Sequence, residues 1–220
     1  MSASLPRIAV LASGRGSNLQ AILDAIGSGR LRAEVVGVFS DRPAAEALLR
    51  VEPGLRWAHA PKEFSDRATY EQTLGDALAA AQPDWIICAG YMRILGAIFV
   101  QRFAGRLVNI HPSLLPLHKG LDTHARALQA GDAEHGASVH LVVPELDAGA
   151  VLAQARVPVR PGDDAQALAA RVLAVEHPLL IATLRLLCSG RLAERDGQPW
   201  LDGHPLFNPL ALDSAGNLNR

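Results

Sequence analysis

Cysteine, lysine and aromatic residues are scarce in this 220-residue chain, which has only two cysteines and two lysines. Cys88 and Cys188 form no CxxC pair and no Cys/His spacing typical of a zinc site, so we expect two buried, reduced thiols and no metal. The formal net charge of -1 argues against nucleic acid as the main partner. These scarcities leave small molecules as the expected ligands.

The N-terminal sequence also shows no pattern that targets a protein to a membrane. Residues 1–7 are short, include Pro6 and carry neither a signal peptide nor a stretch that could span a bilayer, so we expect a cytoplasmic protein. Apolar residues make up 49% of the chain, which is enough for a sizeable core. We find no repeat or linker and therefore expect one domain over residues 1–220, with a core at 7–205 and a loose tail after 195.

Strands alternate with helices in the first half of the chain. Apolar or β-branched runs predict strands at 7–12, 34–40, 55–59, 85–89 and 107–111. Helical spacing predicts helices at 17–26, 44–49, 66–81 and 98–103. This α/β order indicates a doubly wound, mostly parallel, Rossmann-like sheet, which binds ligands outside the carboxyl ends of its strands.

The second half of the chain has a different pattern. Two strand-like segments, 138–143 and 151–159, are close in sequence and predict an antiparallel addition to the fold. Helices are expected at 124–130 and 165–187, and Pro178 is expected to kink or split the second one.

The sequence SGRGSN at 13–18, the glycine loop, joins the first predicted strand to the first helix. Amide groups at a helix N-terminus attract anions, and Ser17 or Asn18 is expected to cap the helix, contact the ligand, or both. A dinucleotide fingerprint needs a third glycine where Leu19 stands, although Asp41 could bind a ribose. A single phosphate therefore fits best, and a nicotinamide-dependent oxidoreductase remains the alternative from another class.

Polar residues follow the fifth predicted strand. Asn109 and His111 are two residues apart and so project from the same face, where an amide and an imidazole can stabilise an oxyanion or move a proton. Local bonding to backbone explains the pair equally well. Asp147 supplies a carboxylate from a turn-rich segment, but turn formation alone explains an aspartate there.

Over roughly residues 7 to 205, the chain resembles the glycinamide ribonucleotide formyltransferases of purine biosynthesis. The resemblance rests on motifs in the right order: SGRGSNLQAI at 13–22, AGYMRIL at 89–95, GRLVNIHPSLLP at 105–116, HGASVH at 135–140 and ELDAG at 145–149. It implies the formyltransferase fold and a monomer or homodimer that uses 10-formyltetrahydrofolate as co-substrate and needs no metal.

The resemblance also implies roles for individual residues. Asn109, His111 and Asp147 would be catalytic. Gly16, Ser17 and Asn18 would hold the substrate phosphate, and Glu176 the ribose hydroxyls. The formyl-folate would contact Arg67, Met92, Arg93, Ile94, Leu95, Asn109, Val143, Pro144, Glu145, Leu146 and Asp147. The substrate amine would attack the formyl carbon directly and give a tetrahedral intermediate.

Four other interpretations remain open. A formyltetrahydrofolate hydrolase usually carries an extra N-terminal regulatory domain, and a methionyl-tRNA formyltransferase carries a C-terminal nucleic-acid-binding domain; neither domain is expected here. Other folate-dependent formyltransferases share the same chemistry. A non-catalytic nucleotide-binding module would keep its function after Asn109→Ala or His111→Ala, which separates it from an enzyme.

Overall fold

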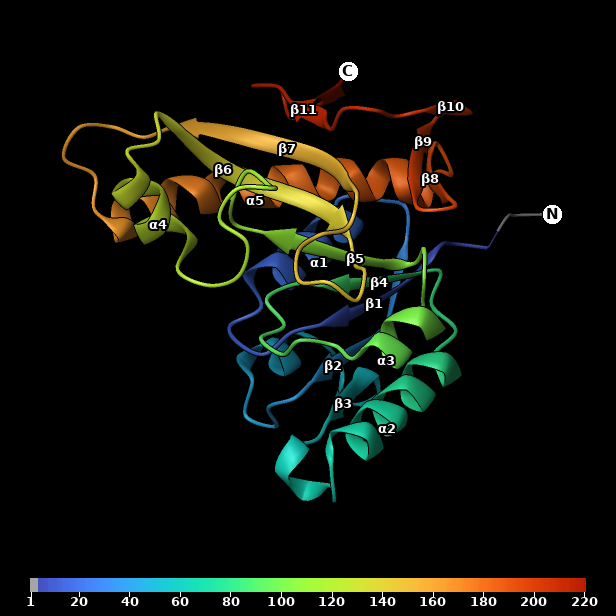
Figure 1. Cartoon of the computed structure of the whole chain (residues 1–220). Helices are drawn as coiled ribbons and strands as arrows, with labels where there is room; N and C mark the ends of the chain where they lie inside the picture. Colours follow the sequence, from blue (N-terminus) through green and yellow to red (C-terminus); the bar gives the residue numbers. More distant parts are fainter. Residues whose placement is uncertain (1–3) are drawn as a thin grey trace. The chain divides into compact units, whose positions relative to one another are not determined.

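A computed structural model describes residues 4–220 of the chain (Figure 1). Residues 1–3, which begin the segment expected to lack a signal peptide, lie outside the described residues. The chain divides into two compact units, one that ends at Asn109 and one that comprises Ile110–Arg220. The expectation of a single domain over residues 1–220 stays a prediction.

Five parallel strands form the sheet of the first unit, and the last of them continues for two residues into the second. They are β1 (Arg7–Leu11), β2 (Glu34–Ser40), β3 (Arg56–Ala58), β4 (Trp85–Cys88) and β5 (Leu107–His111). Their order is β5-β4-β1-β2-β3, which confirms the predicted doubly wound arrangement. The strand order reverses between β1 and β4, so the loops after these two strands border the switch point, where such sheets bind ligands.

The helices of the first unit follow the predicted order. They are α1 (Ser17–Gly27), η1 (Glu46–Arg50), η2 (Pro53–Leu55), η3 (Pro61–Glu63), α2 (Arg67–Ala80) and α3 (Ala97–Arg102). The carboxylate of Asp66 caps α2 by accepting the Thr69 N–H at 2.7 Å, and α2 ends before Pro83 as predicted. The short helix expected at 44–49 is a 3-10 helix, η1. Helix α2 packs beside α3 (Figure 1).

The second unit contains the antiparallel pair that the sequence predicts. Its elements up to residue 188 are α4 (Thr123–Ala130), β6 (Glu134–Leu141), β7 (Val151–Pro158) and α5 (Ala165–Cys188). β6 pairs with β7 in antiparallel register, and α5 packs against both strands (Figure 1). β6 begins four residues earlier than expected, because Glu134–Ala137 also pair with β7.

Helix α5 runs through Pro178 as one element, so of the two predicted outcomes, a kink or a split, the split is wrong. Apolar residues on both sides of the proline are buried, including Leu168, Val172, Leu179 and Leu180, and this burial keeps the helix continuous. Within residues 4–220, α5 is the one helix with the length and apolar composition of a membrane span, although its buried residues pack on β6 and β7.

The tail differs from the loose segment expected after residue 195. β8 (Leu192–Arg195), β9 (Gln198–Leu201) and β10 (His204–Pro205) form a small antiparallel sheet. β11 (Leu210–Leu212) pairs in parallel with β7, and β12 (Leu218–Asn219) pairs with β11. The Asp213 carboxylate accepts the N–H groups of Ala215 and Asn217 at 2.9 and 2.8 Å, which fixes the turn between the last two strands.

Candidate active site

The glycine loop leads directly into α1. Gly16 is the N-cap residue in a left-handed conformation, with φ of 73°, and no side chain caps the helix. The expectation that Ser17 or Asn18 caps α1 is therefore wrong, because Gly16 occupies the cap position. The first-turn amides of a helix have no acceptor within the helix, so the N-terminus of α1 can bind an anion, as a phosphate site requires.

Helix η1 holds the glycine loop in this conformation. The Ala47 N–H donates to the Gly14 carbonyl at 3.0 Å, and Arg50 Nε donates to the Arg15 carbonyl at 2.9 Å. A Cβ added at Gly16 would lie 2.7 Å from Ala47 Cβ. The loop is thus fixed from outside α1, and residue 16 has space only for glycine.

Arg67 and the loop after β4 come together, as the proposed folate contacts require. Arg67 Nη2 donates to the Ile94 carbonyl at 2.7 Å, and its Nε donates to Glu71 Oε1 at 2.7 Å. The same carboxylate oxygen accepts the Gly96 N–H at 3.1 Å. One turn of α2 therefore supports the loop of residues 90–96, the 90–96 loop.

Three side chains of the 90–96 loop, Met92, Arg93 and Ile94, are exposed in the described structure. Met92 is 58% exposed and Ile94 is 61% exposed, which is unusual for apolar side chains and leaves apolar surface for a ligand ring. The Arg93 guanidinium carbon lies 5.8 Å from the centre of the Tyr70 ring. Leu95, by contrast, is buried and anchors the loop.

His111 and Asp147 meet in the second unit although 36 positions separate them in the sequence. His111 Nδ1 lies 3.5 Å from Asp147 Oδ2, and both side chains are buried. His111 Nε2 lies 3.1 Å from the carbonyl oxygen of His118, which can only accept. Because both neighbours are acceptors, the arrangement suits an imidazolium that donates from both nitrogens.

Neighbouring groups hold the carboxylate of Asp147 next to His111. Asp147 has a positive φ of 46°, and its Oδ2 accepts the Gly120 N–H at 2.8 Å. His140 Nε2 lies 3.6 Å from Asp147 Oδ1, while His140 Nδ1 donates to the Leu141 carbonyl at 2.8 Å. Burial lowers the pKa of His140, which favours the neutral imidazole next to the carboxylate.

The remaining predicted residues occupy defined positions in their own units. Asn109 is on β5 two residues before His111, so both side chains project from the same face of the strand. Glu176 lies at the middle of α5. Residues 143–146 form the irregular segment between β6 and Asp147, and Leu146 is 49% exposed.

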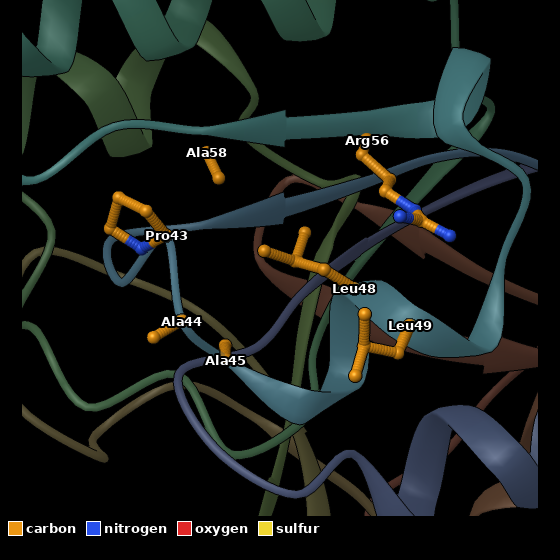
Figure 2. A pocket seen from close by; sticks show the side chains of 7 residues that line it. All are labelled: Pro43, Ala44, Ala45, Leu48, Leu49, Arg56 and Ala58. Atoms are coloured by element: carbon orange, nitrogen blue, oxygen red, sulfur yellow. The ribbon is translucent and has the colours of Figure 1, made fainter.

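A separate pocket of about 430 Å³ lies in the first unit, between β3, η1 and residues 43–45 (Figure 2). Its lining is mostly apolar: Pro43, Ala44, Ala45, Leu48, Leu49, Arg56 and Ala58. Arg56 Nε donates to the Val51 carbonyl at 2.9 Å. None of the predicted catalytic or ligand-binding residues lines this pocket.

No group of three or more His, Cys, Asp or Glu side chains among residues 4–220 is arranged to hold a metal ion. Both cysteines are free thiols, and burial raises the pKa of Cys88 to about 12. Neither thiol belongs to a segment that is predicted to bind a ligand.

Comparison with known proteins places the chain among enzymes of one kind. The family model described as formyl transferase matches residues 6–184. The phosphoribosylglycinamide formyltransferase of Escherichia coli K12 is 44% identical over 201 residues, covering 90% of this chain and 95% of that protein. The Haemophilus influenzae enzyme of the same name is 41% identical over 204 residues, 92% of this chain and 96% of that protein.

Solved structures agree with this comparison. The phosphoribosylglycinamide formyltransferase from Coxiella burnetii matches with a TM-score of 0.87 and 44% identity, over 92% of this chain and 96% of that chain. The similarity therefore extends over nearly the whole of both molecules.

Proposed function

We propose a catalytic route from the premise that the chain belongs to the phosphoribosylglycinamide formyltransferases. Members of this family formylate glycinamide ribonucleotide in purine biosynthesis, and this chain is such an enzyme. The proposed formyl donor is 10-formyltetrahydrofolate. The observation that carries the proposed route is the buried contact between His111 Nδ1 and Asp147 Oδ2, at 3.5 Å.

The amine of the nucleotide attacks the formyl carbon, and a C–N bond forms while the carbonyl oxygen takes up the electron pair. His111 Nε2–H then donates to the resulting oxyanion. In the described structure this N–H points at the carbonyl oxygen of His118, at 3.1 Å, so it is already oriented towards an oxygen acceptor. The side-chain amide of Asn109, on the same strand face, is the second proposed donor.

Asp147 has two tasks in this route. Its carboxylate orients the His111 imidazole through Nδ1, at 3.5 Å, and leaves Nε2–H to donate to the oxyanion. It also accepts a proton from the attacking amine and passes it, through water, to N10 of the folate. The C–N10 bond breaks as that nitrogen is protonated, which releases tetrahydrofolate and the formylated nucleotide.

The nucleotide is bound by its phosphate and its ribose. The first-turn amides of α1 and the glycine loop receive the phosphate of glycinamide ribonucleotide, with Gly16, Ser17 and Asn18 as the contacts. The carboxylate of Glu176 accepts hydrogen bonds from the ribose hydroxyls. Both contacts use groups whose chemistry matches their ligands, amides for an anion and an acceptor for hydroxyls.

The folate is bound by backbone groups and exposed apolar side chains. Residues 92–95 and 143–147 offer irregular backbone, which can hydrogen-bond a pterin edge, and Met92 and Ile94 offer apolar surface to its rings. Arg67 and Arg93 supply the positive charge for the carboxylates of the folate tail. We further propose a cytoplasmic monomer or homodimer that works without a metal.

Formyl transfer from 10-formyltetrahydrofolate to glycinamide ribonucleotide, measured on the purified full chain with a chelator present, tests this function. We expect tetrahydrofolate to appear only when the nucleotide is present. Release of tetrahydrofolate without the nucleotide would indicate a hydrolase instead. Transfer that stops with the chelator and returns with added metal would contradict the metal-free route.

A further inference from the structure

We propose that Ser13 and Asp41 are positioning residues that hold the 90–96 loop in place for the folate. The inference rests on the proposed role of residues 92–95 in folate binding. It concerns the first unit alone, where three loops meet at the carboxyl ends of the adjacent strands β4, β1 and β2.

Three hydrogen bonds link these loops through one serine. The Ser13 N–H donates to the Gly90 carbonyl at 3.0 Å. The Met92 N–H donates to Ser13 Oγ at 2.9 Å, and Ser13 Oγ–H donates to Asp41 Oδ1 at 2.5 Å. Ser13 follows β1, Asp41 follows β2, and Gly90 and Met92 follow β4, so the serine bridges the switch point of the sheet.

The direction of these bonds follows from the chemistry of the groups. A hydroxyl has one proton and two lone pairs, and an ionised carboxylate can only accept. Asp41 therefore fixes the serine proton on its own side and leaves a lone pair directed at the Met92 N–H. Ser13 is 2% exposed and Asp41 is 6% exposed, so water does not compete for either bond.

The same geometry argues against a ribose-binding role for Asp41. The aspartate was a candidate for binding a ribose in a dinucleotide site, but its carboxylate is buried and bonded to Ser13. The carboxylate instead stabilises the arrangement of the loops that follow β1, β2 and β4. Asp41 would then act on the folate only through Ser13 and Met92, without touching either substrate.

Loss of the Ser13 hydroxyl should affect the two substrates unequally. The glycine loop keeps its support, because Ala47 N–H and Arg50 Nε donate to backbone carbonyls of Gly14 and Arg15. The 90–96 loop loses the bond to Met92, the residue that opens the proposed folate segment. Arg50→Met is the matched opposite variant, since it removes a support of the glycine loop and leaves Ser13 and Met92 unchanged.

Steady-state kinetics of Ser13→Ala, Asp41→Ala, Asp41→Asn and Arg50→Met test the inference. For Ser13→Ala and Asp41→Ala we expect the KM for 10-formyltetrahydrofolate to rise about three- to tenfold, as for the loss of one buried hydrogen bond, with the KM for the nucleotide changed less than about twofold. Asp41→Asn should rescue folate binding, because its amide oxygen still accepts from Ser13. Arg50→Met should show the reverse split between the two substrates.

Equal rises in both KM values for Ser13→Ala, or no rise in the folate KM, would overturn the inference. Calorimetric titration with tetrahydrofolate repeats the test without turnover, so it separates this inference from the proposed reaction. A wild-type chain that binds tetrahydrofolate but transfers no formyl group would contradict the proposed function alone. Unchanged tetrahydrofolate affinity in Ser13→Ala, or no affinity in the wild type, would overturn the positioning role.

Discussion

At Gly16 the backbone has φ of 73°, and a Cβ there would lie 2.7 Å from Ala47 Cβ and 2.8 Å from Ala47 Cα. Both facts exclude a side chain, one through backbone strain and the other through steric overlap. Gly14, two residues earlier, has no atom within 4 Å of an added Cβ. Gly16 therefore leaves no space for a side chain, whereas Gly14 in the same loop does.

Gly16→Ala should raise the KM for glycinamide ribonucleotide at least about tenfold, because the strain and overlap together cost on the order of 1–3 kcal/mol and displace the phosphate-binding amides. Gly14→Ala is the matched control and should leave this KM close to the wild-type value. Steady-state kinetics with varied nucleotide decides between them. Equal KM values for the two variants would show that Gly16 is not constrained as described.

Single residues differ in how far the sequence could predict them. Asn109, His111 and Asp147 were selected because their residue types and motif positions carry chemistry. Ser13 was seen only as part of the glycine loop, since its bond to Met92 spans 79 positions and depends on the sheet. The motif HGASVH contains His140 but does not show that this side chain lies 3.6 Å from Asp147, because that contact depends on the fold.

Strand β6 carries two buried histidines, His135 and His140, that are 1% and 2% exposed. Burial, followed by the nearby His124 and His118, lowers the pKa of His135 to about 4, and Asp132 opposes this shift. His135 Nε2 lies 3.1 Å from His124 Nδ1 on α4. The native state therefore keeps the His135 imidazole neutral at pH values where an exposed histidine is protonated.

The buried His135 on β6 should make the protein less stable in mild acid. The unfolded chain takes up a proton on His135 below about pH 6.5, whereas the folded chain does so only near 4, so stability is present above 6.5 and is lost as pH falls towards 4. We expect the free energy of unfolding to be lower at pH 5 than at pH 7.5 by on the order of 1 kcal/mol from this group. Urea unfolding at both pH values measures it, and His135→Gln should show a smaller pH dependence. An equal dependence in the variant would contradict the assignment to His135.

Helix α5 contains an exposed proline inside a continuous helix. Pro178 has no N–H for the carbonyl four residues earlier, and a proline in a helix interior usually costs about 3 kcal/mol relative to alanine. The sequence alone indicated a kink or a split at this point. It could not show that buried residues on both sides, such as Val172 and Leu179, would hold the helix together.

Pro178→Ala should therefore stabilise the protein, by on the order of 1 kcal/mol, since the side chain is exposed and its removal leaves no cavity. The measurement is the urea midpoint at pH 7.5, with the formyl-transfer rate as a check on the native state. A lower midpoint for the variant would mean that the packing of α5 depends on the proline.

For the whole molecule, the parallel, doubly wound arrangement of β1–β5 was the most predictable feature, because alternating strand and helix patterns lead to parallel crossover units. The order β5-β4-β1-β2-β3 itself comes from the structure. The tail was the least predictable part. Its Gly, Pro and Asn residues predict an irregular segment. β11 is nevertheless a strand, because it pairs with β7, more than 50 positions earlier in the sequence.

In the proposed route His111 and Asp147 act as one catalytic unit. The single-turnover rate of formyl transfer at saturating substrates tests this in His111→Ala, Asp147→Asn and the double variant, with thermal unfolding as the check on folding. We expect each single change to slow transfer by about a hundred- to a thousandfold and the double variant to be about as slow as the slower single one. Single variants that keep near wild-type rates, or losses that multiply in the double variant, would contradict it.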